Sequence, residues 1–98
     1  MARIHTHPGE VLREEFMVPL GLSANALARD LHVPPNRITA IIAATTPRGV
    51  WPDTALRLAR YFRTTPEFWL NLQAAYDLST TVAAQGARIR TEVRPRAA

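Results

Sequence analysis

Apolar residues recur along most of this chain at the three- and four-residue spacing that is typical of amphipathic helices. Prolines, glycines and residues that favour helix ends separate these apolar stripes from one another. The pattern therefore predicts five helices, which lie close to residues 8–17, 23–31, 34–43, 52–62 and 65–78.

Several of the predicted helices carry clear start signals. Ser23 is a favourable N-cap for the second helix, and Pro34 with Pro35 begins the third. Thr65 and Pro66 combine an N-cap with a proline in the first turn. Pro19 and Gly21 are expected to end the first helix.

The helical pattern weakens after residue 78, where Gly86 and Pro95 interrupt it. We expect a helical domain over residues 1–78 and a basic C-terminal extension over 79–98, partly helical or mobile. The net charge of the chain is +4, and the extension supplies most of it through four of the twelve arginines. We interpret the extension as a solubilising tail in preference to a nucleic-acid contact.

The most informative stretch is 22–43, where a helix of about eight residues is followed by a very short turn and a second helix. This spacing is that of a helix-turn-helix, whose second helix enters the DNA major groove. Ala28 is small where the two helices must cross, and Val33 fills the turn. Helix pairs of this kind also occur as plain packing units in bundles, so spacing alone leaves both interpretations open.

The predicted second helix of this pair has a polar face with suitable chemistry for DNA. If its isoleucines are buried, Arg37 can pair with guanine O6 and N7, and Asn36 with adenine N6 and N7. Thr39 and Ala40 can touch a thymine methyl group, and free N–H groups at the helix starts can hold phosphates. The candidate DNA-binding residues are Ser23, Asn25, Pro35, Asn36, Arg37, Thr39, Ala40, Ala43, Thr45 and Arg48.

The last predicted helix carries more apolar residues than one face can hold. Phe68, Trp69 and Tyr76 are interpreted as core residues, with the surplus forming a contact between two copies. We therefore expect a homodimer whose interface includes Phe68, Leu70, Asn71, Ala74 and Leu78.

Other classes of function find little support in the sequence. There is no cysteine, and His5, His7 and Glu10 are interpreted as a helix start, not as a metal site. No phosphate loop and no catalytic triad is visible, so we expect neither an enzyme nor a cofactor, metal or small-molecule substrate. No signal peptide or run of about 18 to 20 apolar residues is present, so we expect a cytoplasmic protein without a membrane partner.

Three blocks of sequence point to a known family: HPGEVLREEF at 7–16, PLGLS at 19–23, and DTALRLARYF at 53–62 continuing to TPEFWLNLQ at 65–73. Over residues 7–78 the chain resembles the HigA-type antitoxins, a branch of the Xre/Cro-like helix-turn-helix repressors. The resemblance implies an all-α, five-helix, lambda-repressor-like helix-turn-helix domain, to which the weaker pattern after residue 78 adds the expectation of a flexible C-terminal tail. It also implies a dimer that neutralises a RelE-like, mRNA-cleaving toxin of the HigB type and represses its own operon through double-stranded operator DNA.

The chain departs from this family pattern at three places. Ala24 stands where the wider class often has a glutamine that contacts DNA, and His32 stands where it prefers glycine. The loop 44–49 carries less charge than is usual. Two alternatives therefore stay open: a stand-alone repressor, and a toxin-neutralising interaction module with little DNA binding.

Overall fold

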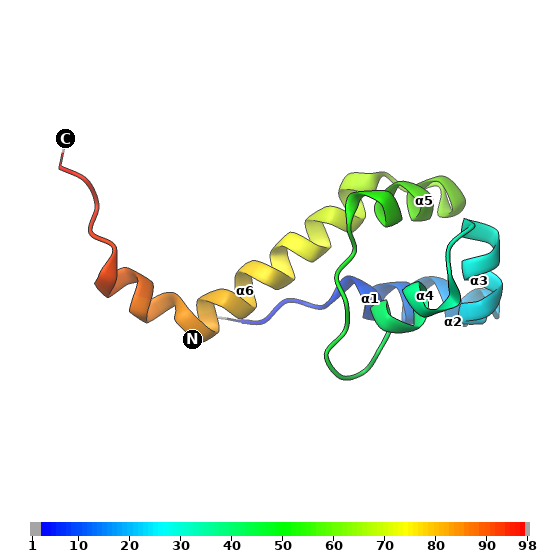
Figure 1. Cartoon of the computed structure of the whole chain (residues 1–98), viewed down its shortest axis with the longest axis horizontal. Helices are drawn as coiled ribbons and strands as arrows, with labels where there is room; N and C mark the ends of the chain where they lie inside the picture. The colour runs from blue at the N-terminus through cyan, green and yellow to red at the C-terminus, as the bar shows by residue number, and fades with distance from the viewer. Residues whose placement is uncertain (1–2, 98) are drawn as a thin grey trace.

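The computed structural model describes residues 3–97, and within them it contains helices and no strand (Figure 1). The first helical segment runs without a break through three elements, α1 (Pro8–Val11), the π-helical η1 (Leu12–Met17) and α2 (Val18–Leu20). Four further helices follow: α3 (Ala24–Leu31), α4 (Pro35–Ile41), α5 (Pro52–Phe62) and α6 (Pro66–Glu92). The prediction of an all-α fold with five helical segments is confirmed.

The first segment extends beyond its expected end near Met17 and includes Pro19. Its backbone hydrogen bonds span five residues there, as in a π-helix: the Val18 N–H donates to the Arg13 carbonyl. A proline cannot join a regular α-helical ladder, because it has no N–H. The π-helical turns lie directly before Pro19, where the regular series of α-helical hydrogen bonds would be interrupted. Gly21, with φ of 64°, then ends the segment.

The predicted helix starts are confirmed by their capping bonds. The Ser23 hydroxyl accepts a hydrogen bond of 3.1 Å from the Ala26 N–H, and the Thr65 hydroxyl accepts one of 3.1 Å from the Phe68 N–H. His7 provides a third cap, because its Nδ1 accepts a 2.8 Å bond from the Gly9 N–H. The helix-start interpretation of His7 therefore agrees with its observed role.

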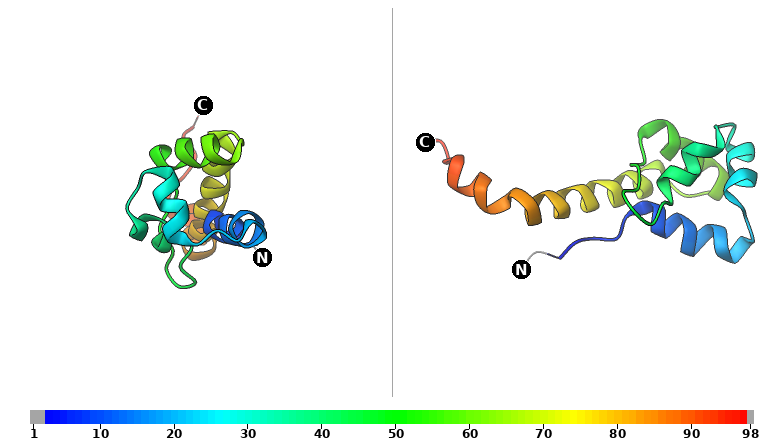
Figure 2. Two further views of the ribbon diagram at one scale, coloured as in Figure 1. Left: turned by 90° about the vertical axis from the view of Figure 1, so that its right-hand side faces the viewer. Right: turned by 60° about the horizontal axis from the view of Figure 1, so that its bottom comes forward.

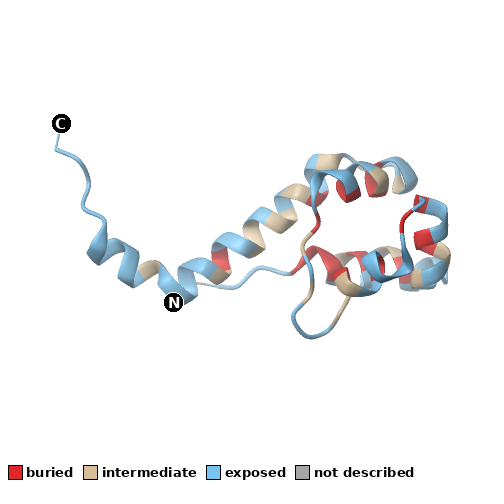
Figure 3. Cartoon of the chain, viewed as in Figure 1, coloured by how far each residue is buried: buried red, intermediate tan, exposed pale blue. Residues whose placement is uncertain are grey.

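The core lies where α3, α4, α5 and the first turns of α6 meet the first segment (Figure 3). Ala28 is fully buried, as the crossing of α3 and α4 requires, and His32 between them adopts a left-handed φ of 59°. Trp69 is the largest fully buried side chain, and its N–H donates to the Thr64 hydroxyl at 2.8 Å. The buried apolar residues are Leu12, Met17, Leu27, Ala28, Leu31, Val33, Ile38, Ile41, Val50, Ala55, Leu58, Ala59 and Trp69.

The longest helix, α6, continues to Glu92. The expected end of the last helix near residue 78 and the expected break at Gly86 are therefore wrong, whereas an extension that is partly helical agrees with the structure. A glycine inside a helix costs only about 0.5–1 kcal/mol relative to alanine, which its helix-forming neighbours can offset. The second half of α6 projects away from the other helices (Figure 2). The radius of gyration is accordingly 16.2 Å, against roughly 13 Å for a compact domain of this length.

Candidate nucleic-acid interface

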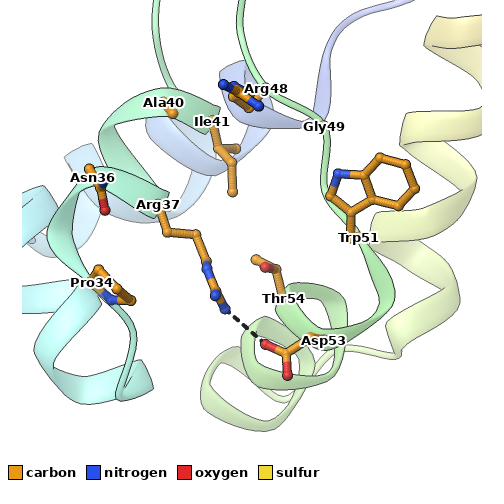
Figure 4. Close-up of a pocket in the computed structure, with 10 residues that line it drawn as sticks. All are labelled: Pro34, Asn36, Arg37, Ala40, Ile41, Arg48, Gly49, Trp51, Asp53 and Thr54. Atoms are coloured by element: carbon orange, nitrogen blue, oxygen red, sulfur yellow. Dashed lines mark hydrogen bonds and ion pairs between the residues drawn. The ribbon is translucent and has the colours of Figure 1, made fainter.

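The outward face of α4 is free for a partner, as the sequence predicts. Ile38 and Ile41 point into the core and are almost completely buried. Asn36, Arg37 and Thr39 are exposed. Arg37 lies at the edge of the buried face and reaches across toward α5 (Figure 4). These side chains are therefore available for contacts outside the domain.

A groove of about 440 Å³ lies between α4 and the segment that leads into α5 (Figure 4). Asn36 and Arg37 line it from α4, while Trp51 and Asp53 line it from the opposite side. Arg48, at the end of the loop after α4, also lines the groove. Sequence reasoning had identified the α4 side of this groove and Arg48, but neither Trp51 nor Asp53.

Asp53 joins two arginines in this region. Its Oδ1 accepts a 2.9 Å bond from Arg37 Nη1 and another 2.9 Å bond from Arg57 Nε. The hydrogen bond from Arg57 lowers the pKa of Asp53 most, and the charges of both arginines lower it further. Asp53 therefore stays ionised, and holds Arg37, at neutral and mildly acidic pH.

Arg57 has a structural role that the sequence did not indicate. Arg57 is half-buried, and its Nη1 donates a 2.8 Å bond to the Leu31 carbonyl. This carbonyl belongs to the last turn of α3, where backbone oxygens lack partners within the helix. Arg57 thus connects α5 to the end of α3 and at the same time holds Asp53.

The loop after α4 is attached to α6 through one glutamine. Gln73 Oε1 accepts a 2.7 Å bond from the Val50 N–H, and Gln73 Nε2 donates a 3.0 Å bond to Asp77. Two residues before Val50, the Arg48 N–H donates a 2.9 Å bond to the Ala40 carbonyl. These bonds fix the backbone on both sides of the Arg48 side chain.

His7 packs beneath the same loop. Its ring meets the Tyr76 ring edge-on at a centroid distance of 4.8 Å. Burial lowers the pKa of His7, against the opposing effects of the Asp77 charge and a hydrogen bond with the Arg48 backbone. Gly9, two residues on, has no room for a side chain, since a Cβ there would overlap the Ile41 carbonyl. The start of the first helix therefore supports both the end of α4 and the loop that follows it.

The remaining candidate DNA-binding residues do not line the groove. Ser23 and Asn25 are exposed at the start of α3, where the Ser23 hydroxyl already serves as a cap. Pro35 and Thr45 are exposed, and Ala43 is half-buried just beyond α4. Of the ten candidates, the groove brings together Asn36, Arg37, Ala40 and Arg48.

The candidate dimer residues divide into two groups on α6. Phe68, Asn71, Ala74 and Leu78 are exposed, and Leu78 keeps 66% of its surface. Leu70 is only partly exposed and packs against the core. The first group is available to a second copy, whereas Leu70 is largely used within the chain.

Two helices joined by a three-residue turn, the second with an exposed polar face, define a protein of the helix-turn-helix class. No protein-family model matches the chain. Curated relatives do: it is 58% identical over 72 residues to virulence-associated protein I of Dichelobacter nodosus, a match that covers 74% of this chain and 65% of that protein. It is also 40% identical over 73 residues to antitoxin HigA-1 of Vibrio cholerae, a match that covers 74% of this chain and 67% of that protein.

Solved structures agree with these relatives. The HigA-family addiction module antidote protein of Coxiella burnetii is 49% identical with a TM-score of 0.87, over 96% of this chain and 100% of that one. The antitoxin HigA of Pseudomonas aeruginosa, solved with the higBA promoter, is 43% identical with a TM-score of 0.87, over 94% and 98%. The chain belongs to the HigA family of antitoxins, a branch of the Xre-like helix-turn-helix proteins. It spans just under two thirds of the length of virulence-associated protein I.

No helix in the described part of the chain is both long enough and apolar enough to span a bilayer.

Proposed function

We propose that this protein is the antitoxin of a type II toxin–antitoxin pair and that it represses its own operon by binding operator DNA. The observation that carries the proposal is the outward face of α4, where Asn36, Arg37 and Thr39 are exposed while the isoleucines of the same helix are buried. Such a helix can place amide, guanidinium and methyl groups against base edges in a major groove. The protein acts by binding and not by catalysis.

Operator binding is supported by the family. The antitoxin HigA of Pseudomonas aeruginosa, which shares the fold of this chain closely, was solved with its promoter. The test is fluorescence anisotropy with a labelled duplex from the promoter of the protein's own operon, beside a scrambled duplex, at two salt concentrations. We expect tighter binding to the promoter and weaker binding of both duplexes at the higher salt. Equal binding to both duplexes would overturn the repressor proposal and favour the toxin-neutralising interaction module.

We also propose that the protein works as a homodimer, joined along α6. Because this helix runs without a break to Glu92, residues three and four apart along it share a face. Phe68, Asn71 and Leu78 lie on one such face, and Val82 and Ile89 continue it; all five are exposed. An apolar stripe of this kind is typical of a helix that pairs with another helix.

A symmetric dimer has a consequence for the operator. It presents two copies of α4 related by a two-fold axis, so the operator is expected to be an inverted repeat. The centres of its half-sites should lie about 10–10.5 bp apart or a multiple of that distance. Footprinting of the promoter would test this spacing directly.

Neutralisation of a RelE-like, mRNA-cleaving toxin of the HigB type is the second half of the proposal. Its support is the membership in the HigA family, whose Vibrio cholerae relative is named an antitoxin. A gene for a small basic protein directly upstream would support the pair, whereas its absence would favour the stand-alone repressor. Co-expression of the two proteins in growing cells would then measure the neutralisation itself.

A further inference from the structure

We propose that Trp51 is a further DNA-binding residue, whose indole ring packs against the sugar–phosphate backbone beside the recognition helix α4. This inference rests on the proposed function. It adds a contact that is independent of base sequence to the base-reading residues of α4.

The exposure of Trp51 has no explanation within the domain. Trp51 keeps 73% of its surface exposed, the largest value among the exposed large apolar residues of the described chain. Trp51 is also the N-cap residue of α5, yet its side chain makes no capping bond there. Trp69, by contrast, is fully buried and bonded to Thr64. Neither packing nor capping therefore accounts for a tryptophan at position 51.

The position of Trp51 indicates a partner. It lines the groove opposite Asn36 and Arg37, and its ring stands beside the groove in Figure 4. A helix with its side chains is about 10–12 Å wide, and the major groove of B-DNA is about 12 Å wide. A recognition helix therefore fills the major groove of the DNA. Protein segments that flank the helix then meet the phosphate backbone at the edge of that major groove. Trp51 is on such a flanking segment.

The chemistry of the indole suits a backbone contact. Its flat apolar surface can cover a deoxyribose, and its N–H is a donor that phosphate oxygens accept. Arg48 lines the same groove and supplies a positive charge for the phosphates. The neighbouring carboxylate of Asp53 would repel phosphate, but Arg37 and Arg57 both pair with it.

Fluorescence offers a direct test because the chain has two tryptophans in opposite environments. The buried Trp69 should respond little to DNA, whereas the exposed Trp51 should change its emission when a sugar covers it. Unlabelled promoter duplex is added to the wild-type protein and to Trp51→Phe, and binding is followed in parallel by anisotropy of a labelled duplex. We expect emission to shift and quench in the wild type and to stay constant in Trp51→Phe.

A second variant measures the contribution to affinity. Trp51→Ala should weaken binding to promoter and scrambled duplexes by the same factor, roughly fivefold for each half-site, because the apolar area that it loses is modest. The salt dependence should stay unchanged, since the indole carries no charge, whereas Arg48→Ala should make it shallower. Leu56→Ala is the matched control: Leu56 is 60% exposed on α5 and does not line the groove.

The outcomes separate this inference from the proposed function. A wild type that binds neither duplex overturns both. A wild type that binds with unchanged tryptophan emission, or a Trp51→Ala variant that binds as the wild type does, overturns the Trp51 contact alone. Loss of promoter binding with scrambled binding intact would show base reading and would also overturn the backbone contact.

Discussion

Arg37 and Asp53 form an ion pair in which the guanidinium Nη1 lies 2.9 Å from the carboxylate Oδ1. The residue with the best chemistry for reading guanine is thus held by a carboxylate of the following helix. Both side chains are well exposed, so water weakens their attraction. A guanidinium also has five N–H donors, and one bond to Asp53 leaves the others for a base. We therefore interpret Asp53 as a group that orients Arg37 before DNA arrives.

The first prediction concerns Arg37 itself. Arg37→Ala should weaken promoter binding by about 1–3 kcal/mol for each half-site and reduce the preference at one base pair, because a bidentate contact to guanine is lost. Anisotropy titrations with a set of single-base promoter variants measure both effects. Arg60→Ala is the control, since Arg60 is exposed on α5 and does not line the groove. Wild-type affinity and base preference in Arg37→Ala would show that Arg37 does not read a base.

The second prediction concerns Asp53. Asp53→Asn should tighten binding to promoter and scrambled duplexes alike, because one negative charge near the DNA is removed. The ratio of the two affinities should fall, because Arg37 loses the carboxylate that orients it. Asp30→Asn is the matched control: it makes the same change of charge, at a residue bonded to Tyr61 that does not line the groove. An unchanged affinity ratio in Asp53→Asn would refute the orienting role.

Helix starts and the exposure of α4 residues such as Asn36 were predictable because they depend on residues close together in the chain. Ser23 and Thr65 each cap the N–H three residues further on. Burial of Ile38 and Ile41 leaves Asn36 and Thr39 on the outside by helical geometry, whereas Arg37, one turn before Ile41, lies at the edge of the buried face. Features that depend only on residues three or four positions apart can be deduced from one sequence without a known fold.

The side of the groove that Asp53 lines depends on contacts between helices. These contacts could not be predicted from residues close together in the chain. Asp53 is 16 residues from Arg37, and Gln73 is 23 residues from Val50, so only the packed fold brings each pair together. The length of α6 was missed for another reason. Beyond Ser79 none of its described residues is buried, so the core-facing pattern stops although the helix continues.

The third prediction is a pH dependence from His7. Because burial lowers its pKa below the ordinary 6.5, the unfolded chain binds a proton that the folded chain resists. The contribution of His7 to the free energy of unfolding should therefore be constant above about pH 6.5 and should decrease as the pH falls from there toward the lowered pKa. Urea unfolding at about pH 7.5 and about pH 5.5, on either side of the ordinary histidine value, measures the difference.

A substitution assigns this effect to His7. His7→Asn should reduce the difference between the two pH values, because asparagine can still cap the Gly9 N–H but does not titrate there. His5→Asn, at an exposed neighbouring position, serves as the control. An equal loss of stability at low pH in the wild type and in His7→Asn would assign the effect to another group.

The fourth prediction tests the dimer. Light scattering at micromolar concentration should give about twice the chain mass of 10.9 kDa. Val82→Glu should shift this value toward the monomer, because it places a charge in the apolar stripe of α6. Ala84→Glu adds the same charge on the opposite face of the helix and should leave the dimer intact. A monomeric wild type, or two variants that behave alike, would contradict the proposed interface.

The fifth prediction separates DNA binding from neutralisation of the toxin. Asn36 and Arg37 are exposed on α4, whereas exposed apolar residues outside the proposed dimer interface, such as Leu20 and Leu56, lie on other elements. A double variant, Asn36→Ala with Arg37→Ala, should therefore lose repression of a promoter reporter but still rescue cells that express the neighbouring toxin. Far-UV circular dichroism establishes that the variant is folded, and an empty vector gives the growth without rescue. If the folded double variant fails to rescue, the toxin occupies the recognition helix, and repression and neutralisation compete for one surface.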